Sequence, residues 1–278
     1  ARPSARPSAR PSARRFAPRF VSRRRRARTS VSARWFPARF SSILSGMAST
    51  VLGKRPALPT DGAMSEATSG ARGHTTGAKR PRNGMPREAD IAAFVVTQVS
   101  EGRWAHIRGV ADTAAYIARG RGLDVDAARV AGFLHDVCKE APLPELVTTA
   151  RAAGIPFEDD EAALHGLMHA AAGAAVAKTR FGIVREDVLE AIRFHPTGRA
   201  GLLPLAQVLY VADYTEAGRP WGDKEEIADL AYVDLPRAVL RTAALKIKHL
   251  LDEGRPIHPR SIECWNYFAR ECASRKAP

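Results

Sequence analysis

The feature that most constrains this chain is the helical spacing of its apolar residues from Pro86 to the C-terminus. Apolar positions recur every three or four residues, and the alternation that marks strands is almost absent. Asp124 and Asp234 stand where N-caps are expected, and Pro144 suits a first helical turn. We therefore expect an all-α fold with helices at 87–101, 103–120, 125–136, 144–153, 160–180, 185–195, 203–217, 223–230, 234–253 and 259–272.

The first 84 residues differ in composition from the rest of the chain. They contain 19 Lys and Arg against two acidic residues, and they begin with Ala-Arg-Pro-Ser three times over. Such a sequence cannot bury enough apolar surface to offset the entropy lost on ordering. We expect residues 1–85 to form a disordered, basic tail and linker, and residues 86–278 to form one folded domain.

Three interpretations of the tail stay open: a targeting peptide, a nucleic-acid-binding tail, or sequence upstream of the true start. An Arg-rich and Ser-rich segment with few acidic residues is typical of transit peptides. However, the chain does not begin with Met, and its first methionine is Met47, which favours a plain tail or sequence not translated in the cell. The remainder has 24 basic and 27 acidic residues, so a nucleic-acid partner is expected only through the tail.

Cysteine usage and hydropathy indicate the compartment. The three cysteines, Cys138, Cys264 and Cys272, are odd in number and show no CxxC spacing, which argues against a disulfide framework. The longest apolar stretches, 202–212 and 170–177, are shorter than the roughly 18 residues that a membrane span needs. We expect a cytoplasmic protein with no membrane partner; the sequence leaves a homodimer open.

Polar residues in apolar surroundings are the most informative feature for function. His135 and Asp136 close an apolar helical run that begins at Val130. Burying a carboxylate and an imidazole together is costly unless each is paired or bound to a cation. A single His-Asp pair is weak evidence, because most such pairs lie at helix ends without any special role.

Other polar residues lie in similar apolar surroundings along the chain. His106 lies one turn into a helix, His169 precedes a run of small residues, His195 ends a helix, and Asp213 ends an otherwise apolar one. Four histidines and two aspartates form a mixed nitrogen and oxygen ligand set, which suits iron, manganese or zinc. Six ligands exceed what one catalytic metal needs, so we expect two metals, with Asp136 able to bridge them.

The order of His106, His135-Asp136 and the distant Asp213 resembles the HD-domain superfamily of metal-dependent phosphohydrolases. Five segments resemble the YqeK family more closely, and the resemblance runs from about residue 88 to 268. That family consists of symmetrical bis(5'-nucleosyl)-tetraphosphatases, which convert diadenosine tetraphosphate into two ADP. The segments are 103–110, 133–139, 168–170, 191–199 and 208–219.

The resemblance implies an HD-domain helical bundle with a two-iron centre, manganese or zinc being alternatives. Asp136 and Lys139 would be catalytic, and Lys139, Thr197, Arg199 and Arg219 would contact the polyphosphate. The implied metal ligands are His106, His135, Asp136, His169, His195 and Asp213.

The chain departs from the family pattern at two positions that leave the ligands intact. Pro196 stands where the family usually has a hydroxyl residue, and Ala217 where it usually has proline. Both departures put substrate preference in more doubt than metal binding.

Each ligand has a plainer interpretation, such as a surface histidine at 106 or a C-terminal histidine at 195 that favours the helix dipole. Their joint occurrence at family spacing favours the site. Two rival functions stay open. One is another HD-type phosphohydrolase acting on nucleoside triphosphates, guanosine polyphosphates or cyclic dinucleotides. The other is a non-catalytic module that binds metal and associates with nucleotide or RNA.

Other residues could take part in a site but are expected to be structural. His165, four residues before His169, could substitute as a ligand, although an edge or solvated role is favoured. The tryptophans and tyrosines are expected to pack in the core, although Trp221 in a loop could line a nucleotide pocket. Cys138 is expected to be a small core residue rather than a nucleophile.

Overall fold

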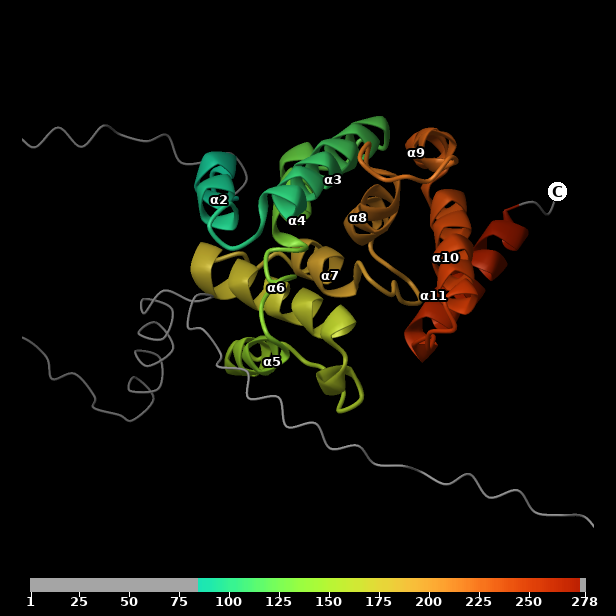
Figure 1. Ribbon diagram of the computed structural model, residues 1–278. Helices are drawn as coiled ribbons and strands as arrows, with labels where there is room; N and C mark the ends of the chain where they lie inside the picture. Colours follow the sequence, from blue (N-terminus) through green and yellow to red (C-terminus); the bar gives the residue numbers. More distant parts are fainter. Residues whose placement is uncertain (1–84, 276–278) are drawn as a thin grey trace, which may run out of the picture.

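The computed structural model describes residues 85–275 of the chain. This part is helical and contains no strand, which confirms the all-α prediction (Figure 1). The expected tail at 1–84 lies outside the described residues, while Met85, the last residue of the expected linker, is buried in the core. The helices are α2 (Glu88–Val95), α3 (Glu101–Gly120), α4 (Val125–Leu134), α5 (Leu143–Ala152), the 3-10 helix η2 (Glu161–Ala163), α6 (His165–Phe181), α7 (Glu186–Phe194), α8 (Pro204–Thr215), α9 (Lys224–Val233), α10 (Leu235–Asp252) and α11 (Pro259–Ser274).

The expected start signals are confirmed at three helices. The Asp124 carboxylate accepts a hydrogen bond from the Ala127 N–H at 3.0 Å, which caps α4. Asp234 caps α10 in the same way through the Arg237 N–H. Pro144 lies in the first turn of α5, where its missing N–H leaves no hydrogen bond unmade.

Two predicted helices are wrong in extent. The helix expected at 87–101 ends at Val95, and Ser100, which was expected inside it, instead caps α3 by accepting a hydrogen bond from the Arg103 N–H. The helix expected at 160–180 is interrupted at Leu164, whose extended backbone separates η2 from α6. In both places the apolar spacing continues across a turn, so periodicity alone does not reveal the break.

Glycine residues, which have no side chain, allow the central helices to approach closely. A Cβ atom at Gly132 of α4 would lie 2.5 Å from the Ala111 Cα of α3, so the two backbones are in contact there. A Cβ atom at Gly173 of α6 would lie 3.1 Å from the Leu134 carbonyl oxygen at the end of α4. The glycines therefore bring α3 and α6 against the same end of α4.

The remaining helices pack around this centre (Figure 1). Helix α6 lies between α5 and α7, and α8 contacts α3, α7, α9 and α10. Helix α11 packs along α10 at the C-terminal side of the molecule. Among the described residues, no helix combines the length and apolar character that crossing a membrane requires.

One buried ionic cluster ties three elements together away from this centre. The Glu161 side chain of η2 is fully buried and accepts hydrogen bonds from Arg193 of α7 and Arg260 of α11, both at 2.7 Å. Its second oxygen also accepts from the Glu158 N–H at 2.9 Å. Burial by itself would raise the pKa of Glu161, but the hydrogen bonds from Arg260 and Arg193 lower it to about 2.

Candidate metal centre

Five helices bring the six predicted ligands together. His106 comes from α3, and His169 comes from α6. His135 and Asp136 follow the last residue of α4, His195 follows the last residue of α7, and Asp213 lies in the last turn of α8. Most of the set thus lies at helix termini, at the point where the five helices converge.

Asp136 lies at the middle of the cluster, with its two oxygens facing different histidines. Oδ1 is 3.0 Å from the His169 Nε2 and 3.5 Å from the His195 Nε2. Oδ2 is 3.7 Å from the His135 Nε2 and 3.8 Å from the His106 Nε2. The carboxylate therefore stands between two pairs of imidazole nitrogens.

Asp213 completes one side of the cluster. Its Oδ1 lies 3.4 Å from the His106 Nε2. One atom from each of His106, His135 and Asp213 lies within 4.8 Å of the others, and the same holds for His135, Asp136 and His195. Each group has the size of a set of ligands around a single ion.

The four histidines present the same nitrogen to the centre. The Nδ1 of His135 lies 2.6 Å from the Gly132 carbonyl oxygen, that of His195 lies 2.9 Å from Ile192 O, and that of His169 lies 3.2 Å from His165 O. A carbonyl oxygen can only accept, so each of these Nδ1 atoms carries the proton. Each Nε2 then carries a lone pair rather than a proton, as a metal-binding imidazole requires.

His106 differs because its Nδ1 contacts a side chain rather than a backbone carbonyl. It lies 3.1 Å from Glu216 Oε1, and Glu216 is itself buried at the end of α8. The second Glu216 oxygen accepts a hydrogen bond from the Gly218 N–H at 2.7 Å. A Cβ atom at Gly109 would lie 2.5 Å from this oxygen, so only glycine at 109 leaves room for the carboxylate.

Unsatisfied atoms at the centre fit a bound cation. Asp136 Oδ1 is buried and has no hydrogen-bond partner among the described residues. The Nε2 atoms of His169 and His195 face each other at 3.1 Å, and those of His106 and His135 at 3.4 Å. Facing lone pairs repel each other unless a proton or a metal lies between them, and four nitrogens with two carboxylates are a donor set for a divalent transition metal.

Protonation states agree with this donor set. Burial lowers the pKa of His135 to about 3 and that of His169 to about 4, so both rings are neutral at neutral pH. Burial would raise the pKa of Asp136, but His135 and Lys139 hold it well below its ordinary value. Asp213 is likewise kept ionised, against the effect of burial, by Lys246.

Four cationic side chains surround the cluster. Lys139 Nζ lies 3.1 Å from the His169 Nε2, and an Arg219 N–H donates to Asp213 Oδ1 at 2.6 Å, so two of the three predicted cations lie at the site. Arg103 donates to Asp136 Oδ2 at 2.9 Å, and Lys246 donates to Asp213 Oδ2 at 3.1 Å. Sequence reasoning missed Arg103, Lys246 and Glu216. Only Arg103 has a local signal, since it precedes His106 by three residues on the same helix.

The other two predicted substrate contacts have different partners. Thr197 is buried, and its hydroxyl donates to the Gly198 carbonyl at 2.8 Å. Arg199 donates to Glu190 at 2.8 Å and lines a separate cavity of about 600 Å³ beside α7. Between these two residues the chain turns at Gly198, where φ is 66°. A role of Thr197 and Arg199 toward substrate stays a prediction.

A smaller cavity of about 180 Å³ opens beside Asp213. Tyr214 and Trp221 line it, so they do not simply fill the core as expected, whereas Tyr210 is buried in the core as predicted. Trp265 is 39% exposed on α11, which contradicts core packing. The remaining lining residues are Asp213, Arg219, Leu245, Lys246 and His249.

The residues with an expected structural role behave accordingly. His165 is exposed, and its Nε2 lies 3.0 Å from the Ala141 carbonyl oxygen rather than at the centre. Cys138 is buried, and burial raises the pKa of its thiol to about 12. A thiol with so high a pKa stays protonated and does not serve as a nucleophile at neutral pH.

Known proteins are similar to this chain over the part that contains the site. The family model described as "HD domain" matches residues 103–218. The symmetrical bis(5'-nucleosyl)-tetraphosphatase of Bacillus subtilis (strain 168) is 32% identical over 66% of this chain and 98% of its own length. The protein of that name from Halalkalibacterium halodurans is 34% identical over 64% of this chain and 95% of its own length.

A solved structure has the same fold. A predicted HD superfamily hydrolase involved in NAD metabolism, from Clostridium acetobutylicum, superposes with a TM-score of 0.63 and 34% identity. The match covers 67% of this chain and 99% of that one. The similarity to all three proteins thus spans nearly their whole length.

Proposed function

Because the chain belongs to the HD-domain family of symmetrical bis(5'-nucleosyl)-tetraphosphatases, we propose that it hydrolyses dinucleoside tetraphosphates, converting diadenosine tetraphosphate into two ADP. The observation that carries this proposal is the cluster itself. Asp136 lies between inward-facing Nε2 atoms, and a ring of cations surrounds it. The surrounding cations suit a polyanionic substrate, and the imidazole and carboxylate groups suit metal ions.

The residues divide into two candidate ligand groups. His106, His135 and Asp213 would hold one ion, and His169 and His195 would hold a second, with Asp136 shared between them. Iron fits this donor set, as do manganese and zinc. A bound metal pair lowers the pKa of a coordinated water and draws charge from phosphoryl oxygens.

The protein's own residues would position and neutralise the substrate. Lys139 and Arg219 are each about 30% exposed, so their cationic ends can reach phosphate oxygens while they remain beside the ligands. Hydrolysis adds the oxygen of one water to a central phosphorus and breaks the bond from that phosphorus to the bridging oxygen. Lys139 would stabilise the charge that develops on the departing diphosphate.

The test measures metal content and products with the full chain, purified anaerobically. We expect about two transition-metal ions per chain and ADP as the sole nucleotide product from diadenosine tetraphosphate. Asp136→Ala should lose both properties. Asp112→Ala, which changes an exposed aspartate of α3 that pairs with Arg129 at the surface, is the matched control and should keep both.

Other outcomes separate the rival functions. Bound metal without turnover of this substrate would redirect the search to nucleoside triphosphates, guanosine polyphosphates and cyclic dinucleotides. Metal binding with no phosphohydrolase activity, together with salt-sensitive RNA binding, would support the non-catalytic module. A chain that binds no metal would overturn the proposal.

A further inference from the structure

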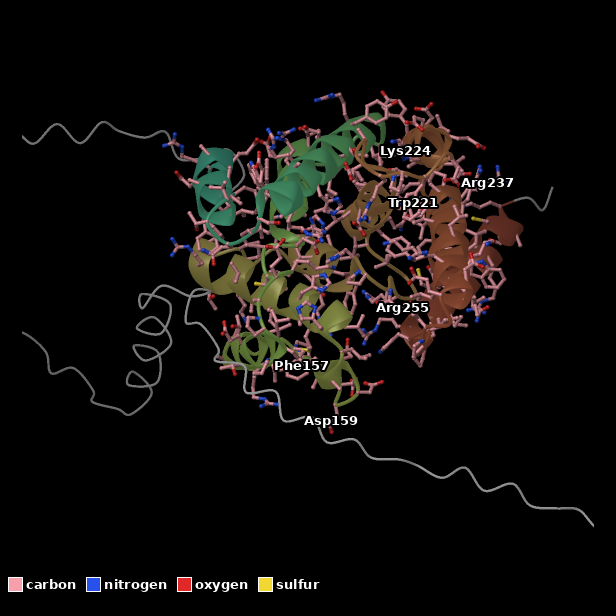
Figure 2. The ribbon with its side chains drawn as sticks, viewed as in Figure 1. Phe157, Asp159, Trp221, Lys224, Arg237 and Arg255 are labelled. Atoms are coloured by element: carbon pink, nitrogen blue, oxygen red, sulfur yellow. The ribbon has the colours of Figure 1, made fainter. Side chains whose placement is uncertain are left out.

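The cavity beside Asp213 lies between the loop that follows α8 and one face of α10. Asp213 and Tyr214 come from α8, Trp221 comes from the loop, and α10 supplies three further lining residues: Leu245, Lys246 and His249. Figure 2 shows Trp221 at the junction of these elements. The cavity therefore shares a wall with the metal centre and continues away from it.

The two ends of the cavity differ in chemistry. Asp213, Arg219 and Lys246 form the end at the metal centre, where both cations donate to the aspartate. The opposite end is aromatic. The Tyr214 and Trp221 rings are stacked with centroids 5.9 Å apart and an interplanar angle of 11°. The His249 ring lies 5.8 Å from the Trp221 ring.

The aromatic end has the size and rigidity of a site for a flat ring. The Tyr214 hydroxyl lies 3.4 Å from Asp223 Oδ1, to which it donates, and this contact fixes the stacked pair. An engineered cavity of about 150 Å³ is large enough to hold benzene, so a cavity of about 180 Å³ that is open on one side admits a heterocycle. Base stacking on an aromatic side chain is a common source of nucleotide affinity.

We propose that this cavity binds one base of the substrate, and that it selects the base by stacking rather than by hydrogen bonds to the base edge. The inference rests on the proposed function. The charged end places phosphates near Asp213, and a nucleoside that extends from them reaches Tyr214 and Trp221. At the aromatic end only two polar groups of the lining lie outside the Tyr214–Asp223 contact, the Trp221 indole N–H and the His249 ring, and the His249 Nε2 already lies 3.4 Å from Glu253 Oε1. Purines should therefore bind better than pyrimidines, with adenine and guanine nearly equal.

The test measures binding of nucleoside diphosphates and of pyrophosphate to the metal-loaded full chain by calorimetry. Trp221→Ala should raise the Kd of ADP about tenfold, as the loss of one stacked base contact predicts. The same variant should leave the Kd of pyrophosphate unchanged, because pyrophosphate carries no base. Trp221→Phe should recover most of the ADP affinity, since it restores an aromatic face.

Trp265→Ala is the matched control, since it removes an exposed tryptophan of α11 outside the cavity and should change neither Kd. In the wild-type chain, GDP should bind within about threefold of ADP, while UDP should bind several-fold more weakly. Equal losses of ADP and pyrophosphate affinity in Trp221→Ala would overturn the proposal. So would unchanged ADP affinity in both Trp221 variants, or a chain that binds pyrophosphate but not ADP.

Hydrolysis of diadenosine tetraphosphate by the same preparations separates this inference from the proposed function. A wild-type chain that hydrolyses the substrate, with the same KM in Trp221→Ala, would leave the function standing and overturn the base site. A chain that binds ADP through Trp221 but releases no ADP from the substrate would do the reverse.

Discussion

The Glu161 cluster and the His/Asp centre both bury ionisable side chains between helices, yet they differ in hydrogen bonding. Both Glu161 oxygens accept hydrogen bonds, from two arginines and a backbone N–H. Asp136 Oδ1 accepts none among the described residues, although its burial is nearly as complete. A buried charge whose partners are all protein groups holds helices together, whereas one with a free lone pair is suited to a ligand from solution.

The largest effect should follow from Asp136→Asn. Loss of the shared anionic ligand should remove bound metal and lower kcat for diadenosine tetraphosphate by about 10³-fold or more. The metal-free variant should lose less stability than a variant of Glu161, because Arg103 and Lys139 are each about 30% exposed and stay hydrated when the carboxylate is lost. Metal analysis, steady-state kinetics and urea unfolding measure these three quantities. A loss of stability in the metal-free variant as large as that of a Glu161 variant would contradict the contrast with Glu161.

Glu161→Gln should have the opposite profile. It leaves the buried Arg193 without its charged partner, and breaking a buried ion pair costs about 3–5 kcal/mol of unfolding free energy. Metal content per folded chain should stay the same. Urea unfolding measures the loss, and Glu226→Gln, which removes an exposed partner of Arg241, is the control and should show no measurable change. A stable Glu161→Gln protein with reduced metal content would reverse the assigned roles.

A smaller effect on metal binding is expected from Glu216→Gln. An amide in place of the carboxylate weakens the acceptor that orients His106 through Nδ1, and loss of such a partner lowers metal affinity about 10–100-fold. Competition with a chelator measures the affinity. Gly109→Ala should act in the same direction, because the added methyl group displaces the Glu216 carboxylate. Unchanged metal affinity in both variants would show that His106 needs no support from Glu216.

A further effect of the Glu161 charge should appear as a pH dependence of stability. The pKa of Glu161 is lowered from 4.5 to about 2 in the folded protein, so its contribution to stability is fully present above pH 4.5. That contribution is lost gradually as the pH falls from 4.5 to about 2, because the unfolded chain takes up the proton first. Urea unfolding should show the difference between wild type and Glu161→Gln shrinking over this range. A constant difference would mean that the Glu161 charge does not matter.

The sequence predicted the all-helical fold and the six candidate ligands that the structure brings together, but for different reasons. Helix positions follow from apolar spacing and from local caps such as Asp124, which act over a few residues. The joint position of His106, His135 and Asp213 came from resemblance, since no local rule brings together residues from three helices. The structure adds the distances between them.

The parts that sequence did not predict depend on tertiary contacts. Lys246 lies on α10 among ordinary helix residues and becomes part of the site only because α10 packs on α8. Tyr214 was expected in the core because large aromatic residues are usually buried, yet it lines a cavity beside Trp221, whose loop position had left a pocket open as the alternative. Arg199 fitted a family position, but Glu190 nine residues earlier is its partner in the structure.

Gly132 contributes both to the packing of two helices and to the position of His135, and this double role limits which substitutions the position can accept. Its missing Cβ sets how close α3 and α4 come, and its carbonyl oxygen accepts the His135 Nδ1–H. A larger residue there would spread the two helices and shift His135 relative to His106 in the same movement. Thermal stability and metal affinity cannot be improved separately at this position, so selection and engineering alike would have to vary other parts of the molecule.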